Sequence, residues 1–280
     1  MKTLVKKIIY GILPSPVIDW LKVRRFYSIF DEYEVSDFPE RPIFEKLLKP
    51  GDSAVDVGAN IGLITKVLMT IVGPTGLVHS IEPVPYTFKV LTSNIERSGA
   101  GNVMCYDVAI SDRDGEATIA VPTYGEIPVV RYDSSGSLGD VRNYHLAHLT
   151  MESSSSADRR ATHHIATRSL DSLLGDRGTR IGLIKCSAVG FELKCMLGAE
   201  RILTLERPAL FIDPCSDPDE PGTPMFQLTA YLCRFGYTPY LAKAGRLQPK
   251  TERLTPGADG LFTQNLFFLT KEQVASAIGV

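Results

Sequence analysis

Short apolar runs alternate with stretches of helical periodicity from residue 53 onward, and this alternation limits the possible folds more than any other feature of the sequence. The helical stretches are 61–72, 85–99 and 191–203, and each lies next to apolar runs of strand length. Those runs are 53–57, 77–82, 102–110, 115–122, 181–186 and 209–213. The pattern predicts an α/β fold in which crossover helices cover both faces of a mostly parallel sheet. Two late segments, 235–242 and 260–270, predict an antiparallel strand pair that closes the sheet.

The first 48 residues have the periodicity of helices, and we expect an N-terminal helical extension at 1–48 before a single α/β domain at 49–280. Residues 1–30 carry six Lys and Arg side chains against Asp19 alone, a local charge of +5 in a chain whose net charge is -2. Two interpretations follow from this. The extension packs on the domain as a helical layer, or its basic and aromatic part lies on an anionic membrane surface.

The composition favours a cytoplasmic protein, with peripheral contact at the inner membrane face as the second expectation. Pro14 and Pro16 interrupt the one apolar stretch that resembles a signal peptide, and no run approaches the length of a membrane-spanning helix. The five cysteines have no C-x-x-C spacing, which is typical of reduced thiols. Because the net charge is close to neutral, we expect no nucleic-acid partner.

The segment DVGANIG, residues 56–62, carries the clearest local signal for a ligand site. Gly58 permits a tight turn and the close approach of a ligand, and Gly62 permits a helix to pack closely on the sheet. A dinucleotide site requires glycine where Asp56 stands, since a carboxylate at that position repels phosphate. The motif therefore favours a cationic ligand without phosphate, and the sulfonium ion S-adenosylmethionine is such a ligand.

Two further acids are expected at the ends of the next two predicted strands. Glu82 is placed to accept hydrogen bonds from both ribose hydroxyls of the donor, because a carboxylate accepts two donors at once. Asp107 is placed to accept from the adenine amino group. An acid at a strand end also commonly caps a helix, so the structural alternative stays open for each of them. Together with Asp56 they predict a donor site along one edge of the sheet.

At these positions the sequence resembles the FkbM-type S-adenosylmethionine-dependent methyltransferases. The residues that carry the resemblance are VDVGANIG (55–62), IEPVPYTFKVLTSNI (81–95), NVMCYDVAISDRDGEATI (102–119), SGSL (135–138), TRSLDSLL (167–174), LIKCSAVGFELKCMLGAERIL (183–203) and QNLFFLTKE (264–272). The resemblance implies a Rossmann-like class I methyltransferase fold whose members mostly methylate hydroxyl oxygens of sugars and natural products. It also implies that Asp56, Gly58, Asn60 and Gly62 form the donor-binding turn and that Glu82 is the ribose acid.

The sequence departs from this family after the strand at 181–186. The family usually has I-K-I-D-V-E-G-F-E, whereas this chain has Ser187 and Val189 in place of the two strand-end acids, and Asp213 replaces the glutamate that is usual after the next strand. Removing a proton from an acceptor hydroxyl needs a general base within hydrogen-bond reach. The candidates are Asp213, His145, His148, His163, His164 and Lys185, the last if burial lowers its pKa. We expect no metal, because His163 and His164 have no third ligand at usable spacing.

Two hypotheses about function remain. The first is an O-methyltransferase that acts on a hydroxyl of a saccharide or secondary metabolite, with a small-molecule or glycan acceptor held by 123–166 and 185–192. The second is a catalytically silent binding or scaffold protein of the same fold, which the changes at Ser187 and Val189 motivate. A nucleic-acid methyltransferase is disfavoured, because the chain has neither a basic face nor a base-pocket motif.

Overall fold

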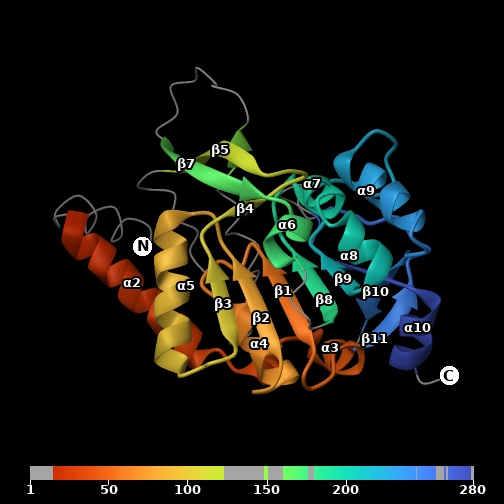
Figure 1. Ribbon diagram of the computed structural model, residues 1–280, viewed down its shortest axis with the longest axis horizontal. Helices are drawn as coiled ribbons and strands as arrows, with labels where there is room; N and C mark the ends of the chain where they lie inside the picture. Colours follow the sequence, from red (N-terminus) through yellow and green to blue (C-terminus); the bar gives the residue numbers. More distant parts are fainter. Residues whose placement is uncertain are drawn as a thin grey trace.

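The computed structural model describes residues 15–122, 148–150, 160–175, 180–243, 245–256, 262 and 264–278. Its centre is an eight-stranded sheet with the order β11-β10-β12-β9-β8-β1-β2-β3 (Figure 1). The strands in that order are Arg246–Pro249, Thr238–Lys243, Leu266–Leu269, Ala209–Ile212, Ile181–Cys186, Ser53–Val57, Leu77–Ile81 and Val103–Tyr106. The five strands from β9 to β3 are parallel, and β12 is antiparallel to both β9 and β10. The predicted α/β class, with its antiparallel closing pair, is confirmed.

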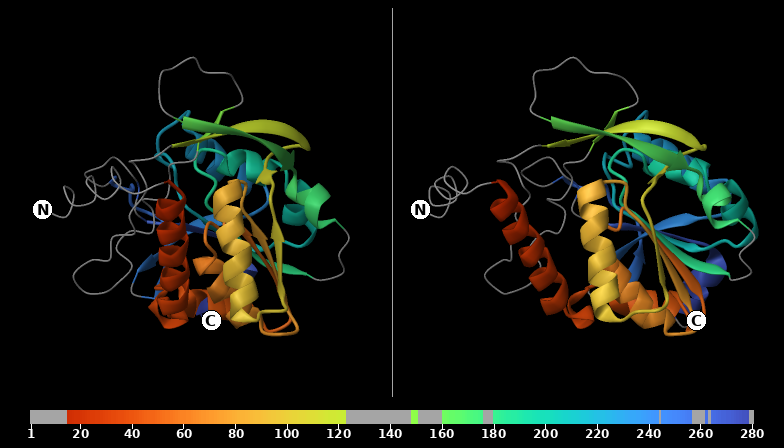
Figure 2. Two further views of the ribbon diagram at one scale, coloured as in Figure 1. Left: turned by 90° about the vertical axis from the view of Figure 1, so that its left-hand side faces the viewer. Right: turned by 60° about the vertical axis from the view of Figure 1, so that its left-hand side comes forward.

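Helices cover both faces of this sheet, as the sequence predicts (Figure 2). The helices of one face are α2 (Ser15–Glu32), α3 (Arg41–Leu47), α4 (Leu63–Val72), α5 (Pro85–Ser98) and α10 (Lys271–Ile278). Those of the other face are α6 (Leu170–Leu174), α7 (Glu192–Leu197), α8 (Glu200–Leu205) and α9 (Pro224–Cys233). A short 3-10 helix, η1 (Val35–Asp37), joins α2 to α3.

The central strands are buried on both faces, which explains their continuous apolar runs. In β12, Phe267 packs with Phe44 of α3 on one side, and Phe268 belongs to the core cluster of the other side. Part of the predicted N-terminal extension joins the first of these cores, because Ile29, Phe30 and Phe44 are almost fully buried there. The later part of that extension, from Ile29 onward, therefore packs on the domain as a helical layer.

A second, smaller sheet was not predicted. It has the order β4-β7-β5-β6, with β4 at Ala109–Ile110, β5 at Gly115–Pro122, β6 at His148–Thr150 and β7 at Arg160–Arg168. The strand predicted at 102–110 is wrong in one respect, because the chain leaves the large sheet after Tyr106 and enters the small one at Ala109. The small sheet lies above the edge of the large sheet at which the parallel strands end (Figure 2).

The helix predicted at 191–203 is also divided, into α7 and α8. Gly198 lies at the break, where a Cβ would be 2.1 Å from the carbonyl oxygen of Ser111. Close packing against the backbone after β4 therefore interrupts the helix. Within the described part of the chain, no helix is both long enough and apolar enough to cross a bilayer.

Candidate active site

In the large sheet, β2 and β3 lie on one side of β1, and β8 and β9 lie on its other side, so the order of the strands switches between β1 and β8. Open α/β sheets bind ligands at such a switch point, beyond the carboxyl ends of the strands. Gly58 begins the turn after β1 with a φ of +72°. Its amide donates to the carbonyl of Ile81 (2.9 Å), which ties this turn to the end of β2. A Cβ at position 58 would be 2.1 Å from the carbonyl oxygen of Ser187, at the end of β8. Glycine is therefore required here to let two neighbouring turns meet.

Gly62, at the start of α4, has a different role from the predicted one. Its φ is +95°, and a Cβ there would lie 2.9 Å from Leu91 of α5 and 3.4 Å from Phe30 of α2. The close approach is therefore to two neighbouring helices, whereas the sequence analysis expects an approach to the sheet. Asn60, between the two glycines, has a positive φ of 52°, which asparagine tolerates better than most residues.

Glu82 faces this turn from the end of β2 and is only 6% exposed. Its Oε2 accepts from the amide of Asn60 (2.9 Å), and its Oε1 accepts from the amide of Val84 (3.0 Å). A carboxylate has about four acceptor positions, so each oxygen has capacity for one more donor. Burial raises the pKa of Glu82 to about 7, against the opposing effects of the two amides and of Lys185. This carboxylate is therefore pre-oriented and suited to accept two hydroxyl groups.

The raised pKa of Glu82 predicts a pH-dependent donor affinity. If Glu82 holds the donor ribose as the sequence predicts, the ribose hydroxyls donate to its ionised carboxylate. A group with a pKa of about 7 goes from mostly protonated at pH 6 to mostly ionised at pH 8. The association constant for the demethylated product, S-adenosylhomocysteine, should therefore rise about tenfold over this interval in a calorimetric titration. Glu82→Gln should bind more weakly at the upper pH and show no such rise. An equal slope in both proteins would assign the titration to another group.

Asp56 lies near the end of β1 and is fully buried, and its expected contact with a cationic donor stays a prediction. Its Oδ2 accepts from the Thr65 hydroxyl (2.7 Å), and its Oδ1 forms an ion pair with Lys185 Nζ (2.9 Å). The same ammonium donates to the carbonyls of Gly58 (2.8 Å) and Val57 (3.2 Å). Asp56 and Lys185 therefore support the turn after β1.

These contacts argue against Lys185 as the general base. Its ammonium donates to two carbonyl oxygens and lies 2.9 Å from a carboxylate oxygen, so it is engaged with the turn on several sides. The register of the sheet places Asp56 directly opposite Lys185 on the neighbouring strand. Lys185 therefore fixes the position of the turn after β1.

Asp107 follows β3 and is exposed, at the expected edge of the sheet. It lies in the two-residue connection from the large sheet to the small one. Its position stays compatible with a contact to the donor, which remains a prediction.

A second group of polar side chains lies after β8 and β9. The Ser187 hydroxyl donates to Asp213 Oδ2 (3.2 Å), and both residues are half-buried. Glu192, at the start of α7, is buried, and its Oε2 accepts from the amide of Gly190 (3.0 Å). Burial raises the pKa of Glu192, and Asp213 and Cys215 are its electrostatic and hydrogen-bonding neighbours. The site therefore keeps two carboxylates near the position where Ser187 replaces one.

Glu192 is a site residue that was not singled out from the sequence. It is the last residue of the segment that corresponds to I-K-I-D-V-E-G-F-E, within the resemblance at 183–203, so the sequence contained a signal. A glutamate in the first turn of a helix is also typical of a helix start, and this explanation gives no indication that the side chain of Glu192 is buried.

The histidine candidates are not brought together with these acids in the described residues. His163 and His164 lie on β7 of the small sheet, and Thr118 on the paired strand contacts His164 Nδ1 (3.4 Å). His148 belongs to β6, and His145 lies outside the described residues. In the same described part of the chain, no three His, Cys, Asp or Glu side chains are arranged to hold a metal ion.

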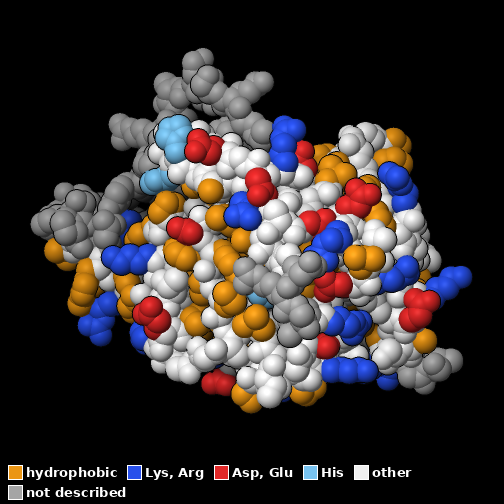
Figure 3. Space-filling view, viewed as in Figure 1, with side chains coloured by type: hydrophobic (Ala, Val, Ile, Leu, Met, Phe, Trp, Pro, Cys, Tyr) orange, Lys and Arg blue, Asp and Glu red, His pale blue; other side chains and the backbone are white. Residues whose placement is uncertain are grey.

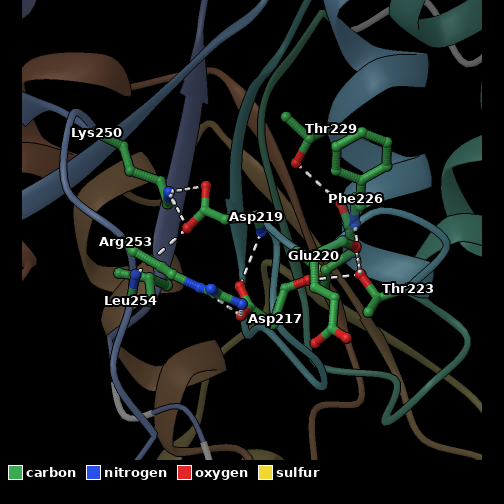
Figure 4. A network of polar contacts seen from close by, with 10 residues as sticks. Asp217, Asp219, Glu220, Thr223, Phe226, Thr229, Lys250, Arg253 and Leu254 are labelled. Carbon is green, nitrogen blue, oxygen red and sulfur yellow. Dashed lines mark hydrogen bonds and ion pairs between the residues drawn. The ribbon is translucent and has the colours of Figure 1, made fainter.

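The loop that follows Asp213 is held in place by a network of ion pairs (Figure 4). Asp217 accepts from Arg253 (2.5 Å), and Asp219 accepts from Lys250 (2.5 Å). The Thr223 hydroxyl accepts from the amide of Phe226 and so caps α9. The loop after Asp213 is thereby held within its length by two ion pairs and at its end by the cap of α9.

Comparison with known proteins identifies relatives of this chain. A family model described as "Methyltransferase FkbM domain" matches residues 56–239. A protein-L-isoaspartate O-methyltransferase of Triticum aestivum is 37% identical over 62 residues, which are 22% of this chain and 27% of that protein. The crystal structure of methyltransferase FkbM from Methylobacillus flagellatus KT is similar with 17% identity and a TM-score of 0.47, over 79% of this chain and 44% of that chain. Cofactor-bound Rv0187 from MTB is similar with 13% identity and a TM-score of 0.44, over 95% of this chain and 96% of that chain. The chain thus spans less than half the length of the first two of these relatives.

Proposed function

The chain belongs to the FkbM methyltransferase family, and on that premise we propose that it transfers a methyl group from S-adenosylmethionine to a hydroxyl oxygen of a saccharide or secondary metabolite. The observation that carries the donor half of this proposal is Glu82. Its carboxylate is buried and is aligned by the amides of Asn60 and Val84, and it has acceptor capacity for two ribose hydroxyls.

The donor supplies an activated methyl group on a sulfonium ion when it is bound. The turn at Gly58 and Asn60 would hold it beside Glu82, and Asp107 would accept from its adenine. The buried pair of Asp56 and Lys185 keeps this turn in place. Methyl transfer is an in-line displacement, so orienting the two reactants can supply much of the acceleration.

The acceptor half of the proposal rests on Asp213. An alkyl hydroxyl must lose its proton during or after its attack on the methyl group. Asp213 is half-buried at the carboxyl edge of the sheet and already accepts a hydrogen bond from a hydroxyl, that of Ser187. Asp213 lies close enough to Glu192 to help raise the pKa of Glu192, but Glu192 is buried, so Asp213 is the better placed proton acceptor.

Asp213→Asn should lower kcat about a hundredfold, because it removes the proton acceptor and leaves the size of the side chain unchanged. The affinity for S-adenosylmethionine should stay within a factor of about two, since no donor contact is assigned to this residue. Single-turnover transfer of a labelled methyl group measures the first quantity, and calorimetry measures the second. A matched control is Asp217→Asn, which alters a carboxylate of the neighbouring ion-pair network. An equal loss in both variants would mean that loop structure, and not proton transfer, is affected.

The proposal as a whole is tested with methyl-labelled S-adenosylmethionine and a panel of monosaccharides, oligosaccharides and polyketides. We expect the label to appear in an alkali-stable methyl ether of one class of acceptor. The substitutions at Ser187 and Val189 favour one rival, a silent binding protein. Donor binding without transfer to any acceptor, together with a gain of transfer in the Ser187→Asp, Val189→Glu double variant, would establish that rival.

A further inference from the structure

Helix α2 has a different environment along its two halves. In its C-terminal half, Ile29 and Phe30 are 2% exposed and pack into the core of the domain. In its N-terminal half, Val17, Trp20 and Leu21 are 40%, 55% and 44% exposed. The spacing of these three residues places them on one face of the helix. The chain therefore presents an apolar face, with its single tryptophan, to the surroundings.

Two basic side chains of α2 lie next to this apolar face. The Arg24 guanidinium lies 5.0 Å from the centre of the Trp20 ring, and Arg25 beside it is exposed. In the space-filling view, hydrophobic and basic side chains lie together at the left edge of the molecule, over α2 (Figure 3). Residues 1–30 have a charge of +5, so the rest of the chain, with a total of -2, has a charge of -7. The positive charge of the chain is therefore concentrated in its first 30 residues, and within the described part of that segment Arg24 and Arg25 are exposed beside the apolar face.

We propose that this face of α2, defined by Val17, Trp20, Leu21, Arg24 and Arg25, docks on the surface of an anionic lipid bilayer. Apolar and aromatic residues beside basic ones are what an interfacial helix requires, and the ring of a tryptophan is suited to the level of the lipid headgroups. Anionic lipids attract the basic residues near the surface, and this attraction weakens with salt. The helix would lie along the surface and remain attached to the domain through its buried C-terminal half.

The charge of this face favours an anionic lipid surface over a second copy of the chain as its partner. A two-fold dimer brings the same patch of both subunits together, so Arg24 and Arg25 of both copies would enter one interface. Like charges that meet in an interface oppose association. An anionic surface complements the patch instead.

The test is flotation of the full chain with phosphatidylcholine vesicles that contain either no anionic lipid or about 30% phosphatidylglycerol. We expect at least about fivefold more protein on the anionic vesicles at low salt, and a decrease as salt is added. The Trp20→Ala, Leu21→Ala double variant should lose most of this binding, and so should Arg24→Glu, Arg25→Glu. Leu205→Ala, at a 70% exposed leucine of α8, is the matched apolar control. Arg246→Glu, Lys271→Glu is the charge control on exposed residues elsewhere, and both controls should float like the wild type.

Three results would overturn the proposal. Equal binding to both kinds of vesicle would remove the electrostatic part, and full binding by the Trp20→Ala, Leu21→Ala variant would assign the binding to another segment. A wild-type dimer in lipid-free solution that the same variant converts to a monomer would assign the face to a second copy. The donor affinity of every variant should remain that of the wild type, so failure of the membrane proposal is distinguishable from failure of the proposed methyl transfer.

Discussion

Replacing Gly58 by alanine should lower the free energy of unfolding by about 4 kcal/mol and the donor affinity about a hundredfold. The added Cβ would lie 2.1 Å from the carbonyl oxygen of Ser187, and a backbone atom at the end of a buried strand cannot rotate away as a side chain does. The positive φ of residue 58 adds a further conformational cost. Moving the turn would also displace Asn60, whose amide orients Glu82. Urea unfolding and calorimetric titration measure the two effects.

Gly99→Ala is a control that separates the steric clash at position 58 from the conformational cost of a positive φ. Gly99 has a φ of +70° at the end of α5, and a Cβ there would have no heavy atom within 4 Å. This variant should lose only about 1–2 kcal/mol of stability and keep the wild-type donor affinity. If Gly58→Ala is no worse than Gly99→Ala, the turns after β1 and β8 are not packed as closely as described.

Replacing Lys185 by methionine should destabilise the fold by about 3–5 kcal/mol. The substitution keeps an unbranched side chain of similar volume but leaves the fully buried carboxylate of Asp56 without its cation. The carbonyls of Val57 and Gly58 lose their donor as well, so the turn that aligns Asn60 loosens. Urea unfolding at neutral pH measures the loss.

A double variant tests whether this loss comes from the buried charge. Adding Asp56→Asn to Lys185→Met removes the uncompensated carboxylate, and Asn still accepts from the Thr65 hydroxyl. Replacing both members of a buried ion pair is often close to neutral, so the double variant should recover most of the stability lost by the single one. Additive losses would show that Lys185 and Asp56 contribute independently, in contradiction to the ion pair.

The strands and helices of the large sheet were predictable because burial on both faces leaves an uninterrupted apolar signal. β1, β2, β8 and β9 are such strands, and each lies where the sequence predicts it. The small sheet was not recognised as a unit. β5 pairs with β7 far along the chain, and β7 carries polar residues such as His163 and His164 in a segment without a clean period. Contacts of this kind are set by tertiary packing, which a local pattern does not contain.

The candidate site also has residues whose roles were predictable from the sequence and residues whose roles were not. The positions of Gly58 and Glu82 follow from the ends of two predictable strands, and the structure places both at the carboxyl edge. The role of Asp56 did not follow, because its partner Lys185 is distant in sequence and becomes a neighbour only through the register of β1 and β8. A strand-end acid that contacts a ligand and one that pairs with a buried lysine look the same in sequence.

The most direct test of a methyl-donor site at this edge of the sheet is calorimetric titration of the wild-type chain with S-adenosylmethionine and S-adenosylhomocysteine at pH 8, where Glu82 with its pKa of about 7 is mostly ionised. We predict that both ligands bind at one site per chain and that Glu82→Gln weakens both. A folded wild-type chain that binds neither ligand would contradict the donor site, and with it the proposed methyl transfer.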